Sequence, residues 1–372
     1  MNPTSSELES LYADAIATLK GLLSRMGEFP EHHEVGRTGG QPSDPARFVS
    51  LPFRVTHVAG RNKSWWIRAV VKSEIHPKQA RLAIWELQQS APEVGKIPVY
   101  SVLIAPYISP AVAQLCEDEE IGHLDLSGNC RLFFGGIWIE LRGKDRKLRE
   151  RKELRSFFSP KTARLLRTLL QGRLTAHKVL DLAEAAGTST GLTSKLRQRL
   201  LEQEWAVNEE GGIRITRPHQ LLDAWVEDDD WAKRTEVREY SLLETDPLKI
   251  ATALKDALEK QKVSHAFTQW FAAWLRAPYT IPPVVSAYVE RFPDDEMLWE
   301  LLKARRVDPG AGRLRLIGSR DFRGVTTPAQ VVKGFTAVSD VQIYLDLLGA
   351  GQRADEQAKE LRNAKDFSGG WE

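Results

Sequence analysis

SPKTARLLRTLLQGRLTAHKVLDLAEAAGTSTGLTSKLRQRLLEQEWAVNEEGGIRITRP, residues 159–218, contains three short amphipathic segments followed by an alternating one. The first, residues 160–171, places alanine and leucine side chains on one face at helical spacing. The second ends at Gly187, a residue suited to the position that follows a helix. The third opens on capping residues 188–190. Residues 206–216 predict two strands joined by a glycine-containing turn.

Two helices, a turn, a third helix and a hairpin are the layout of a winged helix-turn-helix domain, which we predict over residues 156–226. In that fold the third helix enters the major groove of DNA with its N-terminal half. No acidic residue occurs between Ser189 and Leu201, where a carboxylate would be repelled by phosphate. A protein-binding winged helix and an unrelated three-helix bundle are the alternatives, and the polar face with its basic wing favours DNA.

The predicted DNA-binding residues come from three places in this domain. The third helix offers its outward polar and basic positions, the second helix is preceded by a lysine, and the wing carries two arginines. They are Thr190, Thr193, Ser194, Lys195, Arg197, Gln198 and Arg199, then Lys178, then Arg214 and Arg217.

The composition limits where such binding can occur. The chain has 372 residues and a formal net charge of +2, so affinity for nucleic acid must come from local patches. Apolar runs stop well short of about 18 residues, and the first residues lack the features of a signal peptide. The two cysteines, Cys116 and Cys130, form neither a disulfide framework nor a metal motif. We therefore expect a bacterial cytoplasmic protein without a membrane span.

The N-terminal domain, predicted over residues 1–155, begins with a helix at residues 4–27 and continues as a mixed α/β sheet. WWIRAVVKSEIHPKQARLAIWELQ, residues 65–88, resembles the centre of a restriction-endonuclease-like fold. In that superfamily an acid, one residue and a lysine stand at a strand end, and the carboxylates hold Mg²⁺. Lys72 takes the lysine position, but Val70 takes that of the acid. The sequence predicts a nuclease-like scaffold without a metal site.

A metal-dependent nuclease targeted by the winged helix remains the alternative function. It would need carboxylates from other positions, such as Glu74 and Asp125. Residues 121–130, IGHLDLSGNC, also permit a catalytic role for Asp125 with His123. We favour a structural role, in which Asp125 caps the turn at Ser127–Asn129, because no nucleophile or second carboxylate has a place nearby.

Residues 227–372 alternate between helical and strand patterns and predict a second α/β domain that resembles a nucleotidyltransferase. An active nucleotidyltransferase needs a Gly-Ser or Gly-Gly turn followed by an Asp-x-Asp/Glu strand. The corresponding residues, 267–270 and 285–289, carry neither motif. We predict a scaffold without catalytic chemistry. Between the first two domains, residues 142–155 hold eight basic and three acidic side chains, suited to a solvated linker or to phosphate contact.

The segment LDLSGNCRL…GGIWIELRGK, the winged helix and the C-terminal half together resemble the AbiEi-type antitoxin and transcriptional-regulator family of type IV toxin–antitoxin systems. The resemblance covers most of residues 50–362, and its most specific part is Asp125-Leu126-Ser127-Gly128-Asn129. The chain departs from the commonest arrangement by its nuclease-like domain before the winged helix. The resemblance implies a DNA-binding autoregulator, often encoded beside a nucleotidyltransferase-like toxin.

Together these observations predict a homodimeric, antitoxin-like autorepressor that binds double-stranded DNA. A cognate toxin is a candidate partner. We expect no enzymatic activity, cofactor or metal.

Overall fold

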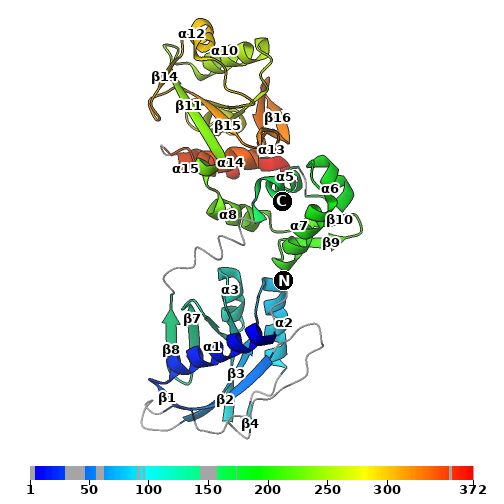
Figure 1. Ribbon diagram of the computed structural model, residues 1–372, viewed down its shortest axis with the longest axis vertical. Helices are drawn as coiled ribbons and strands as arrows, with labels where there is room; N and C mark the ends of the chain where they lie inside the picture. Colours follow the sequence, from blue (N-terminus) through cyan, green and yellow to red (C-terminus); the bar gives the residue numbers. More distant parts are fainter. Residues whose placement is uncertain are drawn as a thin grey trace. The chain divides into compact units, whose positions relative to one another are not determined.

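A computed structural model describes residues 5–29, 47–55, 63–89, 93–94, 97–142, 157–172, 174–351 and 354–371. Contacts divide the chain into two compact units, residues 1–150 with 202–204, and residues 151–201 with 205–372. Both units are mixed α/β, as the sequence predicted (Figure 1). No helix in the described ranges combines the length and the apolar character needed to cross a membrane.

The first unit is a sheet with helices on both faces. Its helices are α1 (Ser5–Leu23), α2 (Pro77–Gln88) and α3 (Pro110–Asp118). Its strands are β1 (Gly27–Glu28), β2 (Arg47–Val55), β3 (Lys63–Val71), β4 (Glu93–Val94), β5 (Ile97–Ala105), β6 (Gly122–Asp125), β7 (Cys130–Phe134) and β8 (Ile137–Leu141). The order is β1-β2-β3-β5-β6-β7-β8, with β4 paired to β5. The central strands β3, β5 and β6 run parallel, because α2 and α3 are crossover helices.

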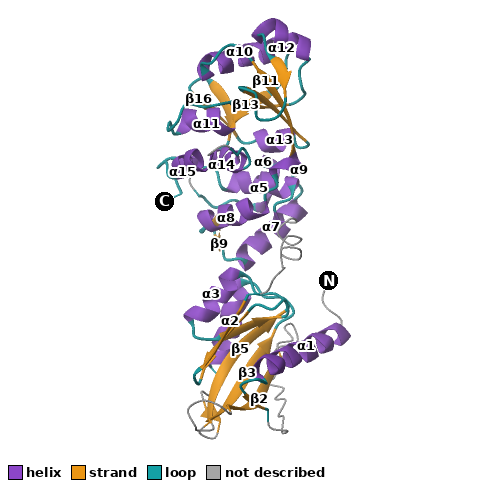
Figure 2. Cartoon of the chain, turned by 90° about the vertical axis from the view of Figure 1, so that its left-hand side faces the viewer, coloured by secondary structure: helices purple, strands orange, loops and turns teal. Residues whose placement is uncertain are grey.

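The ends of β3 and β5 are buried on both faces, which explains their apolar sequences at Ala69–Val71 and Val102–Ala105. Successive residues of β3 illustrate this: Ala69 and Val71 pack with α1, whereas Val70 packs with α2 and α3. Figure 2 shows α1 on one face of the sheet and α2 and α3 on the other. The sequence pattern predicts helices at residues 4–27, 77–89 and 109–119 and a strand at 65–71, which α1, α2, α3 and β3 confirm. It also predicts a strand at residues 54–58, whereas the strand found there covers Arg47–Val55; residues 56–58 lie outside the described residues.

The second unit begins with three helices and a hairpin, α5 (Pro160–Leu169), α6 (Val179–Ala185), α7 (Thr190–Glu202), β9 (Ala206–Glu209) and β10 (Gly212–Ile215). It continues with α8 (Pro218–Asp228), α9 (Trp231–Arg234), β11 (Thr235–Ser241), α10 (Pro247–Lys260), β12 (His265–Thr268), α11 (Gln269–Arg276), β13 (Val285–Val289), α12 (Asp295–Leu302), β14 (Arg305–Val307) and β15 (Leu314–Ser319). The last elements are α13 (Phe322–Thr326), β16 (Ala329–Val332), β17 (Phe335–Val338), α14 (Asp340–Leu348), α15 (Ala354–Arg362) and the 3₁₀ turn η1 (Phe367–Gly369).

A mixed sheet of order β14-β11-β15-β13-β12-β17-β16 forms the centre of this unit. Its core is continuous with that of the three helices: Leu165 of α5, Trp225 of α8 and Tyr288 of β13 belong to one hydrophobic cluster. The two domains expected at residues 156–226 and 227–372 thus lie in one compact unit.

Candidate nucleic-acid interface

The turn between α6 and α7 is fixed by local hydrogen bonds and by a glycine. Gly187 ends α6 with a positive φ of 60°, a conformation that glycine adopts without strain. The hydroxyl of Ser189 accepts a hydrogen bond from the Leu192 amide at 3.3 Å and so caps α7. Both features agree with the roles predicted from the sequence, and they set the direction in which α7 leaves the turn.

The predicted hairpin is antiparallel, and it is joined to the segment before α6. Gly212 lies opposite Glu209, and Ile213 forms an isolated bridge with His177. A Cβ atom on Gly212 would lie 2.0 Å from the His177 carbonyl oxygen, so only glycine fits there. The bridge holds the hairpin beside the start of α6.

One strip of α7 is exposed and polar. Thr190, Ser194 and Gln198 follow one another at the spacing of one helical turn, and Lys195 lies next to them. All four are exposed, whereas Leu196 and Leu200 on the opposite side are buried. The strip has no carboxylate and occupies the first three turns of the helix.

The prediction that Thr193 points outward is wrong. Its side chain is only 1% exposed, and its hydroxyl donates to the Ser189 carbonyl oxygen at 3.0 Å. The same hydroxyl lies 3.2 Å from that of Thr188. Thr193 shares the helix face of Leu196 and Leu200, so it stabilises the turn between α6 and α7 rather than offering a contact.

Three arginines predicted to bind DNA contact other side chains of the protein. The Nε atom of Arg197 donates to the Asn208 side chain of the hairpin at 3.1 Å. The guanidinium of Arg199 lies 4.5 Å from the centre of the Phe157 ring. Arg214 donates to Glu209 at 2.8 Å, and this hydrogen bond lowers the pKa of the exposed Glu209 carboxyl and raises that of Arg214. These contacts orient the side chains.

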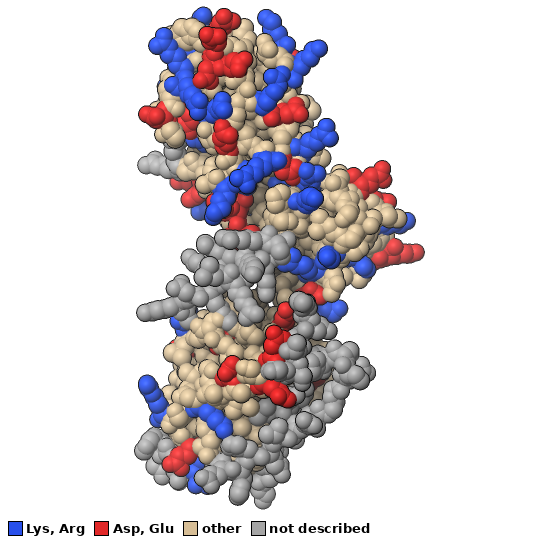
Figure 3. All heavy atoms as spheres, viewed as in Figure 1, with Lys and Arg blue, Asp and Glu red and all other residues tan. Residues whose placement is uncertain are grey.

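The hairpin is therefore less basic than the sequence suggested. Arg214 is balanced by Glu209, and Glu210 at the turn is exposed. Lys178 and Arg217, which precede α6 and α8, are exposed as predicted. On the face shown in Figure 3, lysine and arginine side chains are interspersed with acidic ones over the second unit.

In the first unit, Asp125 holds a turn. Its Oδ1 atom accepts hydrogen bonds from the amides of Ser127 and Asn129 at 2.9 and 3.1 Å, and its Oδ2 atom accepts from the Asn129 side chain at 2.9 Å. These contacts match the structural role favoured from the sequence. Lys72 is buried just after β3, and Glu74 is exposed.

Among the described residues, metal-ligating side chains do not gather in either sheet. The described part of the chain has no group of three or more His, Cys, Asp and Glu side chains placed to hold an ion. Burial lowers the pKa of His123, which favours its neutral form, and raises the pKa of both Cys116 and Cys130 to about 12. Of the basic segment 142–155, only Arg142 lies among the described residues.

The sequence did not reveal a buried polar network on one face of the second sheet. Asp346 of α14 accepts hydrogen bonds from Gln342 at 2.6 Å and Tyr288 at 3.0 Å, and forms a 2.8 Å ion pair with Arg234. The buried Arg167 of α5 donates to Gln342 at 2.7 Å. The network thus connects the first of the three helices to the sheet.

The positions where a nucleotidyltransferase would carry its motif are part of this internal structure. Thr268 ends β12 and donates to Asp346, and Gln269 begins α11 with a positive φ of 51°. All residues of β13 are buried. Among the described residues, α7 is therefore the only element that exposes several of the predicted DNA-binding side chains on one face.

Comparisons with protein-family models, curated proteins and solved structures found no match.

Proposed function

We propose that the three helices and hairpin at residues 157–226 form a winged helix-turn-helix, and that the protein is a sequence-specific regulator of transcription that binds double-stranded DNA. The observation that supports this function best is the exposed, carboxylate-free strip on the first three turns of α7. A recognition helix enters the major groove with its N-terminal part.

The strip divides into residues suited to bases and residues suited to phosphate. A glutamine side chain pairs with adenine through two hydrogen bonds, and serine or threonine hydroxyls bind several bases. Gln198, Ser194 and Thr190 are the candidates for base contact. Lys195, in the second turn of α7, and Lys178, just before α6, are exposed cations that suit phosphate contact.

The resemblance described above supports the biological part of the proposal. It favours an antitoxin-like autorepressor, with a cognate toxin as a candidate protein partner. In a homodimer, two copies of α7 would read half-sites about 34 Å apart, one turn of DNA. The first unit would then be an endonuclease-like scaffold, and the sheet of the second unit a nucleotidyltransferase-like one, neither of them catalytic.

The test starts with the full-length protein and sheared genomic DNA, from which bound fragments are recovered and sequenced. Fluorescence anisotropy on an enriched duplex then compares variants. Gln198→Ala should cost about 1–3 kcal/mol on the specific site and little on random DNA, as expected for loss of a base contact. Lys195→Ala should weaken both, and should reduce the slope of log K against log salt by about 1.

Lys233→Ala supplies the matched control, because Lys233 is an exposed lysine of α9 outside the strip. The proposal fails when no fragment is enriched, or when Gln198→Ala and Lys195→Ala bind the enriched duplex as tightly as the control does. Supercoiled plasmid incubated with Mg²⁺ examines the alternative function. Nicking that disappears in Lys72→Ala would overturn the non-enzymatic part of the proposal.

A further inference from the structure

Arg197 lies at the edge of the polar strip of α7 that faces the hairpin. It follows Ser194 by three residues and precedes Gln198 by one, so that at about 100° per residue Ser194 lies between the other two on the helix surface. Its side chain is partly exposed, whereas Leu196 and Leu200 are buried. Arg197 therefore adds a guanidinium to the surface that carries the Ser194 hydroxyl and the Gln198 amide.

A hydrogen bond to the hairpin fixes the orientation of this guanidinium. The Nε atom of Arg197 donates to the Oδ1 atom of Asn208 at 3.1 Å. Asn208 lies in β9 directly opposite Ile213 of β10, and the Ile213 side chain is buried. Directly opposed residues share a face of a hairpin, so Asn208 lies on the face that packs on the helices. The planar guanidinium is thus held at its Nε edge by a second element.

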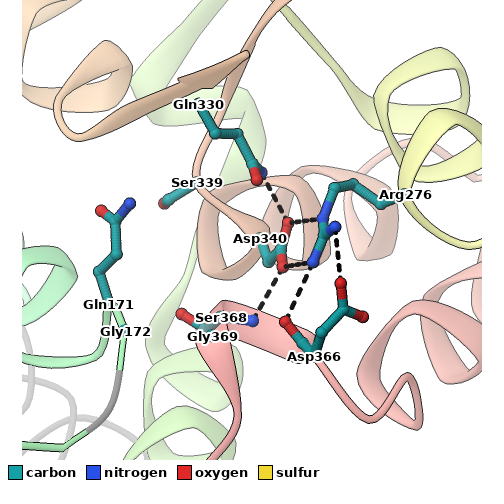
Figure 4. A pocket seen from close by; sticks show the side chains of 9 residues that line it. All are labelled: Gln171, Gly172, Arg276, Gln330, Ser339, Asp340, Asp366, Ser368 and Gly369. Atoms are coloured by element: carbon teal, nitrogen blue, oxygen red, sulfur yellow. Dashed lines mark hydrogen bonds and ion pairs between the residues drawn. The ribbon is translucent and has the colours of Figure 1, made fainter. Parts of the chain in front are cut away.

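This contact leaves the end of the guanidinium, with its two Nη atoms, available. Among the described residues, neither Nη atom of Arg197 has a hydrogen-bond acceptor. Arg276, elsewhere in the second unit, shows the contrast. It uses Nε and both Nη atoms on the carboxylates of Asp340 and Asp366 (Figure 4). Arg197 is oriented in the same manner through Nε, but its remaining donors are not used by the protein.

The partner of Arg197 also leaves its positive charge in place. Arg214 lies on the outer face of the hairpin, where it gives Nε and Nη2 to Glu209, so a carboxylate balances its charge. Asn208, in contrast, is neutral. A cation that is not balanced within the protein is favoured near DNA, where phosphates repel carboxylates and attract cations. Of these two arginines, Arg197 is the one suited to DNA contact.

Two parallel donors at a fixed spacing match a base with two acceptors on its major-groove edge. Guanine presents two acceptors there, N7 and O6, whereas adenine presents one acceptor and one donor, thymine one acceptor and cytosine one donor. We propose that Arg197, oriented by Asn208, binds a guanine in the same half-site as the base that Gln198 contacts. This inference rests on the DNA-binding function proposed above, and it names one base of the target site.

The test uses the full-length protein and the duplex enriched from genomic DNA. Each guanine of the duplex is replaced in turn by 7-deazaguanine, which lacks the N7 acceptor but keeps base pairing. Fluorescence anisotropy should find at least one guanine in each half-site whose replacement weakens wild-type binding about threefold to tenfold, as expected for the loss of one hydrogen bond. Inosine at that position lacks only the minor-groove amino group and should bind as guanine does.

Substitution of Arg197 connects this guanine to its binding residue. Arg197→Ala should weaken binding to the enriched duplex about fivefold to 100-fold, and binding to random DNA much less. It should also remove the sensitivity to 7-deazaguanine, because both changes remove the same hydrogen bond. Gln198→Ala should keep that sensitivity. Arg197→Lys retains the charge and so the binding to random DNA, but without the two parallel donors it should lose most of the specific affinity.

Asn208 is a positioning residue, and a separate variant tests its role. Asn208→Ala releases the Arg197 side chain and should weaken binding to the enriched duplex about threefold to tenfold, with a smaller penalty for 7-deazaguanine. Its melting temperature and its binding to random DNA should stay unchanged, which distinguishes positioning from a role in folding. Val207→Ala is the matched control, because Val207 is the exposed neighbour on the other face of β9.

The possible failures are distinguishable. If no fragment is enriched, the DNA-binding function fails and the guanine contact with it. If Gln198→Ala weakens specific binding but no 7-deazaguanine replacement affects the wild type, only the guanine contact is overturned. The same holds when Arg197→Ala keeps the wild-type sensitivity, or when it weakens specific and random DNA equally, as a phosphate contact would. Thermal melting of each variant establishes that the fold is kept.

Discussion

The two sheets of this protein satisfy their buried carboxylates in different ways. Asp125, at the end of β6, accepts three hydrogen bonds from residues two and four positions along the chain and one, at 3.4 Å, from the Ile108 amide 17 residues away. Asp346, beneath the second sheet, is bonded to Thr268 and Tyr288, which are 78 and 58 residues away. The first arrangement holds a turn, whereas the second holds separate elements together.

The difference has an energetic consequence. A carboxylate that accepts from nearby amides satisfies polar groups of the same turn, and its loss affects that turn. A buried ion pair between distant elements offsets the desolvation of both charges, so removal of one partner leaves the other charge buried and unpaired. We therefore expect substitutions in the second network to be the more damaging.

The largest effect is expected for Arg234→Met. The substitution removes the guanidinium that pairs with Asp346 at 2.8 Å and with Asp229 at 2.8 and 2.9 Å. The free energy of unfolding of the second unit should fall by about 3–5 kcal/mol in urea titrations. Lys233→Met, at a neighbouring side chain that is 74% exposed, should change it by less than about 0.5 kcal/mol.

The same variant should show a distinct pH dependence. Burial raises the pKa of Asp346 in the folded state, and Arg234 opposes that rise. Without Arg234 the folded state favours the protonated acid more strongly, so stability is lost as the pH rises. The deficit relative to the wild type should therefore be largest at neutral pH and should shrink as the pH falls. A deficit independent of pH would show that Asp346 is not the group left unpaired.

A smaller loss is expected for Asp125→Ala. The amides of Ser127 and Asn129 lose their acceptor, and the first unit should lose about 1–3 kcal/mol. Hydrogen exchange should accelerate in β6 and β7, which flank the turn, and not in β13. Asp118→Ala, at an exposed residue of α3, is the control. Equal losses for Asp125→Ala and Arg234→Met would remove the distinction between local and long-range bonding.

The smallest effect is expected for Thr193→Val, which keeps the shape but removes the hydroxyl bonded to the Ser189 carbonyl oxygen. Stability should fall by about 1 kcal/mol, while DNA affinity well below the melting temperature stays unchanged. Ser194→Ala, at the exposed neighbour, should behave in the opposite way. Weaker DNA binding by Thr193→Val at unchanged stability would restore the outward position first predicted for this residue.

Several elements were predictable because their signals are local. The cap at Ser189, the positive φ of Gly187 and the apolar positions of α5 and α7 depend on neighbours within one or two helical turns. The turn at Asp125 was predictable for the same reason. The end of strand β3 was also clear, because its last three residues, Ala69, Val70 and Val71, are buried on both faces and are all apolar.

Other elements had no such signal. The short strand β14 has the sequence Arg-Arg-Val and is defined only by its pairing with β11. The strands β16 and β17 and the network around Asp346 were likewise not predicted, since their partners lie far away in the chain. The orientation of Thr193 was missed because residues one position apart in a helix differ by about 100°, enough to move a side chain from surface to core.

The sequence by itself determined the order of the elements, the caps and turns between them, and the absence of acidic residues from the first three turns of α7. These follow from spacing along the chain. Only the tertiary structure decided which polar side chains remain available: it buried Thr193 and engaged Arg197 and Arg214 with the hairpin. Whether a polar side chain stays exposed and unbonded depends on neighbours from other segments of the chain. No local sequence pattern specifies those neighbours.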